Sequence, residues 1–109
     1  MKDYFKPIEI RWSDLDPNFH LRHSAYYDFG AYSRIAFMNE HGLTPQALTN
    51  MHIGPIIFRE ECVFKKEINF GDEVKVNLIV DKATVDFSRF TIVHAIWKNS
   101  DTLSAVITV

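Results

Sequence analysis

The sequence predicts a single α+β domain in which an antiparallel sheet of about five strands wraps around one long central helix. Apolar residues recur at three- and four-residue intervals between positions 24 and 40, whereas much of the remaining chain alternates as strands do. The chain has 109 residues, of which 47% are hydrophobic, and this supplies one core but not two. Residues 1–109 are therefore expected to form one domain.

The first strand is predicted over residues 4–12, with Trp12 on its apolar face. Pro7 has no N–H to donate to a sheet ladder, so this strand is expected at a sheet edge or beside a bulge. Residues 13–24 show no periodicity and are rich in polar side chains, which indicates a long loop. Ordered loops of this length in small domains commonly carry function.

The central helix is predicted over residues 24–40, with Ser24 as its N-cap and Gly42 as the left-handed residue that ends it. Gly30, in the middle, lowers helix stability by about 1 kcal/mol relative to Ala, which indicates that another element packs closely there. One short helical turn, capped by its first residue, is expected at 44–48.

The second half of the chain is expected to form strands. Turn-forming polar residues separate them at 69–72 and 98–101. The predicted strands cover residues 56–68, 73–83, 87–97 and 102–109. The last one ends without the polar segment that usually follows a buried strand, which suggests that the C-terminal end is truncated.

Charge and composition exclude several classes of protein. The formal net charge is −2 and the Lys and Arg residues are scattered, so no nucleic-acid partner is expected. The single cysteine cannot form an intramolecular disulfide, and the charged N-terminus does not read as a signal peptide. No apolar run reaches the roughly 18–20 residues that span a bilayer. We therefore expect a cytoplasmic protein without a membrane partner.

The size of the domain points to self-association. A domain this short leaves part of its apolar surface uncovered, and an aromatic content of 14% enlarges that surplus. A second copy would cover such surface. We therefore expect a homodimer or a tetramer.

The loop before the helix concentrates groups that are suited to acyl transfer. Within ten residues it carries Asp14, Asp16, Asn18, His20 and His23. The N-terminus of the helix that follows offers unpaired N–H donors and partial positive charge, which can hold the oxyanion formed when an acyl carbonyl is attacked. A nearby carboxylate can activate water as a general base or attack the carbonyl itself.

Segment 14–26, Asp-Leu-Asp-Pro-Asn-Phe-His-Leu-Arg-His-Ser-Ala-Tyr, resembles the signature loop of hotdog-fold thioesterases. Its Asp-x-Asp-Pro opening is similar to the 4-hydroxybenzoyl-CoA thioesterase family, and its Asp-Leu-Asp-x-Asn-x-His pattern is similar to acyl-ACP thioesterases. The Gly-Asp turn within 67–74 also resembles the turn after the family's second strand. The resemblance covers almost the whole chain and implies a hotdog fold that hydrolyses an acyl-CoA or acyl-carrier-protein thioester.

The resemblance also implies roles for individual residues. Asp16 matches the catalytic carboxylate, and Asn18 and His20 match partners that orient or stabilise the reacting groups. The oxyanion donors are implied to be backbone N–H groups at the helix start, which map to His23 and Ser24. Substrate details do not transfer, because the stretch after Asn18 departs from the family pattern.

Substrate contacts are expected on both sides of this loop. Phe19, where the hydroxybenzoyl-type enzymes have glycine, is expected to narrow the site, and Tyr26 is a candidate contact of the acyl group. Arg59 and Arg89 are candidate contacts of the CoA phosphates. No cofactor is expected apart from the coenzyme A of the substrate. No metal is expected either, since the His and Asp spacing follows no established zinc pattern.

Several alternatives stay open at this point. Without the resemblance, Asp16 would be read as an Asx-turn residue before a proline. Asp14 is read as structural, and either Glu60 or Glu61 is expected to face the core or an interface, in a salt bridge or as a general base. An acyl-CoA-binding hotdog sensor without hydrolysis is the main alternative function, and a hotdog dehydratase ranks below it.

Overall fold

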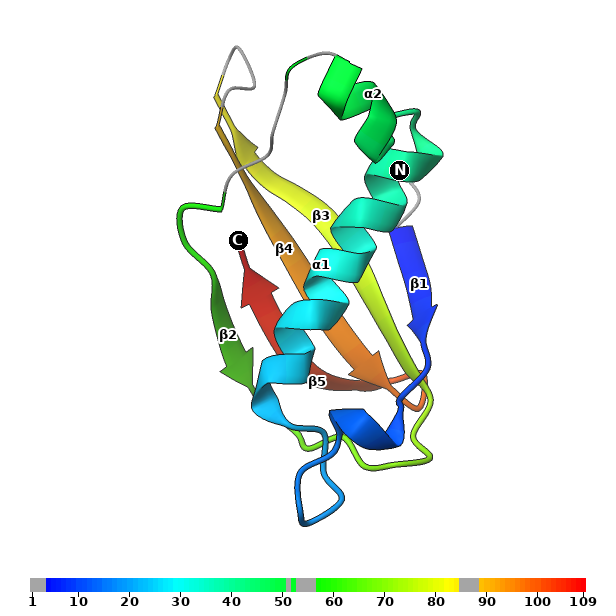
Figure 1. The fold of residues 1–109 in the computed structure, drawn as a ribbon. Coiled ribbons are helices and arrows are strands. Elements are labelled where there is room, and N and C mark those ends of the chain that lie inside the picture. Colours follow the sequence, from blue (N-terminus) through cyan, green and yellow to red (C-terminus); the bar gives the residue numbers. More distant parts are fainter. Residues whose placement is uncertain (1–3, 51, 53–56, 85–88) are drawn as a thin grey trace.

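The computed structural model describes residues 4–50, 52, 57–84 and 89–109 of the chain. Within them, five strands form one antiparallel sheet in the order β1-β3-β4-β5-β2, and helix α1 lies across one face of it (Figure 1). The elements are β1 (Tyr4–Ile8), a 3₁₀ turn η1 (Trp12–Asp14), α1 (His23–Glu40), α2 (Pro45–Asn50), β2 (Glu61–Phe64), β3 (Val74–Ala83), β4 (Phe90–Lys98) and β5 (Thr102–Thr108). The predicted α+β arrangement is confirmed.

Strand β1 lies at one edge of the sheet, as Pro7 indicated, but it ends at Ile8 and not at Trp12. The chain turns into η1 because the backbone N–H of Asp14 donates to the Arg11 carbonyl at 2.9 Å. Trp12 is 82% exposed as a result, so the prediction that it faces the core was wrong.

Strand β2 lies at the other edge and is much shorter than the predicted strand over 56–68, whose first residue lies outside the described residues. It pairs with β5 only over Glu61–Phe64. The ladder ends there because the N–H groups of Lys65 and Lys66 both donate to the Ser104 carbonyl, at 2.8 and 3.0 Å.

Helix α1 begins two residues earlier than a Ser24 cap would require. Its N-cap is Arg22, which makes no side-chain capping bond, so the predicted Ser24 cap was wrong. The helix end agrees with the sequence, because Gly42 has a φ of 82° and the N–H of Leu43 reaches back to the Met38 carbonyl at 2.8 Å. The cap of α2 is also confirmed, since Thr44 Oγ1 accepts the N–H of Ala47 at 3.1 Å.

The core lies between α1 and the sheet. Its fully buried aliphatic side chains come from β3, β4, β5 and the turn before β3, and α1 contributes Ala25, Tyr26 and Phe29. A polar group also lies in this layer, on β4. His94 is completely buried, its Nδ1 lies 2.8 Å from the Asn77 carbonyl, and Arg34 of α1 donates to its Nε2 at 3.0 Å.

Arg34 fixes the state of this histidine. A guanidinium can only donate, so Nε2 of His94 must be unprotonated and Nδ1 must carry the hydrogen that the Asn77 carbonyl accepts. Burial, together with the positive charge of Arg34, lowers the pKa of His94 to about 4. Glu60, just before β2, balances the charge of Arg34, with its Oε2 3.5 Å from Nη2 of Arg34. Of the two roles expected for Glu60 or Glu61, the structure therefore shows a salt bridge for Glu60.

The close approach that Gly30 indicated is made by His94, since a Cβ at position 30 would lie 3.1 Å from His94 Cδ2. We expect Gly30→Ala to lower the free energy of unfolding by about 1 kcal/mol, because overpacking against a ring held at both nitrogens outweighs the gain in helix propensity. Urea unfolding measures this. In a His94→Ala background the same substitution should stabilise the protein, and stabilisation in both backgrounds would contradict the steric explanation.

Candidate active site

The loop over residues 15–21 is closed by Asp16. Its Oδ1 accepts the backbone N–H of Asn18 at 2.9 Å and that of His20 at 3.1 Å, and its own N–H donates to the His20 carbonyl at 2.7 Å. The Asx-turn interpretation is therefore confirmed for one carboxylate oxygen. In the described part of the chain Oδ2 has no hydrogen-bond partner, so the same side chain keeps a basic oxygen available.

The loop is tied to the turn before β3 by a short antiparallel ladder. The N–H of Leu21 donates to the Ile68 carbonyl at 2.7 Å, and His20 pairs with Asn69. Leu21 and Ile68 are 5% and 0% exposed, so they fix which face of this ladder points to the core. Because side chains alternate, His20 is held on the outer face.

Asp14 anchors the entry to the loop and is 1% exposed. Its carboxylate accepts the side chain of Arg11 at 3.0 and 3.3 Å and the Arg11 N–H at 3.0 Å, and Arg22 approaches it to 3.9 Å. Burial would raise the pKa of Asp14, but the hydrogen bonds from Arg11 hold it below its ordinary value. Asp14 is thus structural, as the sequence indicated.

The N-terminus of α1 directly follows this loop. Ala25 N–H donates to the Arg22 carbonyl at 3.0 Å, whereas the N–H groups of His23 and Ser24 meet no acceptor in the described part of the chain. These two N–H groups lie at the N-terminus of an 18-residue helix, where the helix dipole places partial positive charge. The arrangement can bind developing negative charge a few residues from Asp16.

A shallow hollow of about 400 Å³ lies beside Asp16. It is lined by Trp12, Ser13, Leu15, Asp16, Pro17 and Phe19. Its two aromatic walls are largely exposed, at 82% for Trp12 and 72% for Phe19. Sequence reasoning missed Trp12 because the alternating pattern of the first strand continued through it.

Phe19 has a φ of 63°, the left-handed conformation that glycine adopts without strain. We expect Phe19→Gly to raise the free energy of unfolding by roughly 0.5–1 kcal/mol, because relief of strain exceeds the added chain entropy of glycine and little packing is lost. Chemical denaturation measures this, with Phe19→Ala as the control. Equal effects of the two substitutions would contradict a backbone origin.

The other predicted substrate contacts do not line this hollow. Tyr26 is 4% exposed and packs edge-on against Phe64, with ring centroids 5.0 Å apart. Arg89 lies 5.8 Å above the ring of Phe58, and Arg59 pairs with Glu61 at 3.2 Å. A direct role of Tyr26 in substrate binding remains a prediction, as do the roles of the arginines.

Arg89 and the Asp16 loop are attached to opposite ends of β3. The loop is tied to the turn before β3, whereas Arg89 follows the far end of β3 and accepts the Thr84 N–H at 2.9 Å with its carbonyl. A ten-residue strand spans about 30 Å. One chain therefore does not bring Asp16 together with Arg89.

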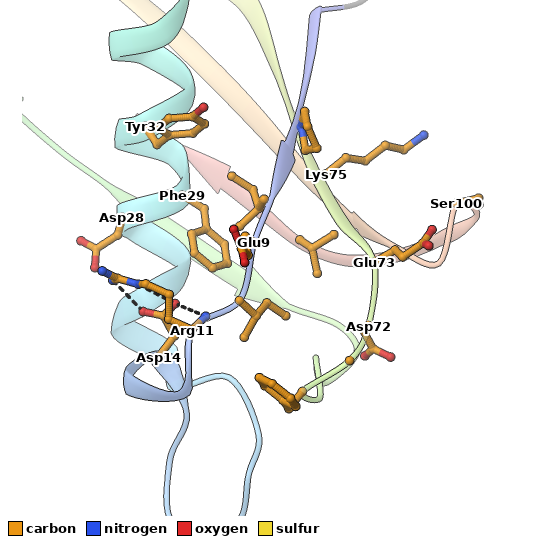
Figure 2. A pocket seen from close by; sticks show the side chains of 16 residues that line it. Glu9, Arg11, Asp14, Asp28, Phe29, Tyr32, Asp72, Glu73, Lys75 and Ser100 are labelled. Atoms are coloured by element: carbon orange, nitrogen blue, oxygen red, sulfur yellow. Dashed lines mark hydrogen bonds and ion pairs between the residues drawn. The ribbon is translucent and has the colours of Figure 1, made fainter.

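A second, larger groove of about 1060 Å³ runs between β1, the first half of α1 and the 70–75 turn (Figure 2). Its charged lining residues are Glu9, Arg11, Asp14, Asp28, Asp72, Glu73 and Lys75. Five carboxylates against two cations make it unfavourable for the phosphates of CoA. Sequence reasoning missed it because its walls come from segments that meet only in the fold.

A long helix on a five-stranded antiparallel sheet, entered through a carboxylate-bearing loop, defines a hotdog-fold domain. The chain belongs to the thioesterase-like superfamily, whose family model matches residues 10–109. Comparison with curated proteins gives no match.

Solved structures of similar fold include a hypothetical protein from Staphylococcus aureus in complex with CoA, with a TM-score of 0.90 and 18% identity. The match covers 98% of this chain and 66% of that protein, so this chain spans slightly less than two thirds of its length. DHNA-CoA thioesterase from Staphylococcus aureus has a TM-score of 0.85 and 20% identity over 99% of this chain and 71% of that one. A 1,4-dihydroxy-2-naphthoyl-CoA thioesterase from Synechocystis has a TM-score of 0.83 and 15% identity, over 98% and 78%. At these identities the likeness establishes the fold.

Two further observations concern the described residues only. They contain no group of three or more His, Cys, Asp or Glu side chains placed to hold a metal ion. None of their helices combines the length and apolar character needed to cross a bilayer.

Proposed function

We propose that the chain hydrolyses an acyl-CoA or acyl-carrier-protein thioester to the free acid and the thiol, with Asp16 as the reactive carboxylate. One observation carries the proposal. Asp16 is held by two backbone N–H groups through Oδ1, and its loop leads into the N-terminus of α1. Among the described residues, neither Oδ2 nor the N–H groups of His23 and Ser24 have a hydrogen-bond partner. General base and oxyanion stabiliser are the two parts that thioester hydrolysis needs.

In the proposed reaction, Oδ2 of Asp16 removes a proton from water that attacks the carbonyl, or it attacks the carbonyl itself. The N–H groups of His23 and Ser24 hold the oxyanion until the thiolate leaves. Asn18 and His20 orient the reacting groups. Membership of the thioesterase-like superfamily supports this reaction class, and the CoA complex of the similar Staphylococcus aureus protein supports CoA as the carrier.

The substrate site is proposed to form between two copies of the chain. Arg89 follows the far end of β3, a strand of ten residues that spans about 30 Å, whereas the Asp16 loop is tied to the turn before β3. Arg89 also packs over Phe58, the neighbour of Arg59, so both arginines would serve the Asp16 of a partner. Strand β2 lies at a sheet edge, with Val63 and Phe64 about half exposed, and such an edge is suited to pairing with a second copy. A homodimer is the minimal assembly of this kind, and two dimers would form a tetramer.

A thiol-release assay over a panel of aromatic, branched, short and long acyl-CoAs tests the function. We expect saturable release of free thiol from at least one member. Saturable binding of acyl-CoAs without thiol release from any CoA or carrier-protein thioester would instead identify a sensor.

A further inference from the structure

The side chain of His20 lies beside Glu67, with Nε2 and Oε2 3.4 Å apart. The short ladder explains this contact. Since His20 is paired with Asn69, the residue two positions earlier, Glu67, lies diagonally opposite His20 on the same face. Burial of Leu21 and Ile68 on the other face fixes this register, because a slip by one residue would expose both.

We propose that Glu67 is a positioning residue for His20: its carboxylate accepts the Nε2–H of the ring and leaves Nδ1 as the basic nitrogen of the active site. A carboxylate that fixes the tautomer and orientation of a histidine is a recurring arrangement in hydrolases. The inference rests on the proposed thioesterase function and adds to it a residue outside the Asp16 loop. His20 and Glu67 are tied together by backbone, so the pair is held without a buried environment.

The ¹⁵N chemical shifts of the His20 ring test the contact independently of activity. At a pH where the ring is neutral, we expect the Nε2–H tautomer to dominate in the wild-type protein, to persist in Glu67→Gln, which keeps an acceptor oxygen, and to lose its excess in Glu67→Ala. Glu73→Ala, which removes another exposed carboxylate near the same turn, should leave the His20 signals unchanged. Wild-type signals in Glu67→Ala would overturn the proposal.

Kinetics test the role of the contact. We expect Glu67→Ala to lower kcat by about tenfold at unchanged KM, and Glu73→Ala to leave both near wild type. If the wild-type protein is active and Glu67→Ala has the same kcat, the role of Glu67 is overturned and the proposed thioesterase function still stands. Absence of hydrolysis by the wild-type protein would overturn the proposed function, and the role of Glu67 in it, even where the tautomer shift confirmed the contact.

Discussion

Asp16→Asn is expected to lower kcat for thioester hydrolysis by at least about a hundredfold, the usual contribution of a general base. At this position the substitution is expected to remove the catalytic carboxylate without disturbing the fold of the loop. The carbonyl oxygen of Asn can still accept the N–H groups of Asn18 and His20 that Oδ1 accepts, so the loop keeps its shape. Only the negative charge and the basic Oδ2 are lost.

Matched variants complete this experiment. Asp16→Ala also removes both loop hydrogen bonds, so it should lose activity and some stability, whereas Asp16→Asn should unfold at nearly the wild-type denaturant concentration. Asp101→Asn removes a carboxylate from the β4–β5 turn and should leave turnover unchanged. Wild-type-like turnover in Asp16→Asn would remove Asp16 from the mechanism.

The second large effect is loss of stability in mild acid, caused by His94. The pKa of His94 is about 4 in the folded chain, against about 6.5 for an unperturbed histidine. The unfolded chain therefore binds this proton first, and the stabilisation present above about pH 6.5 is lost as the pH falls toward 4. The full shift corresponds to about 3 kcal/mol.

The groups around His94, and the other groups with shifted pKa values, define the pH range in which the free energy of unfolding reports on His94. Arg34 faces one ring nitrogen and the Asn77 carbonyl the other, with Glu60 behind Arg34, so protonation would place two cations together. The carboxylates with lowered pKa lose their contribution only below about pH 4.5. Between pH 6.5 and 4.5 the slope is therefore expected to depend mainly on His94.

Urea titrations at several pH values measure this slope. We expect His94→Gln to be less stable than wild type at pH 7.5, because a well-packed ring is lost, but to show a much flatter decline between pH 6.5 and 4.5. Parallel declines in the two proteins would show that His94 is not the responsible group.

The fold could be predicted where local chemistry decides it. Gly42 ends α1 in the left-handed conformation, and the predicted 98–101 turn joins β4 to β5, with Asn99 and Ser100 at left-handed φ values of 51° and 76°. The errors arose where tertiary contacts decide. Trp12 lies outside the strand because the backbone and side chain of Arg11 donate to the carboxylate of buried Asp14, which bends the chain into a turn. No local sequence pattern predicts this contact.

The candidate site divides in the same way. The loop carrying Asp16 could be predicted because its turn hydrogen bonds lie within five residues of sequence. The contact between His20 and Glu67 could not, because it depends on the register of residues 47 positions apart. The separation of Asp16 from Arg89 likewise follows from the direction of β3, which the sequence alone does not specify.

Hydrolysis in ¹⁸O-labelled water, followed by mass spectrometry, tests the central claim most directly. With the best acyl-CoA of the panel, the wild-type protein is expected to release CoA and free acid in equal amounts, with ¹⁸O in the acid, and Asp16→Asn is expected to leave the thioester largely intact over the same time. If every CoA and carrier-protein thioester stays intact when it is incubated with an excess of the wild-type protein, the proposed hydrolysis by Asp16 is contradicted.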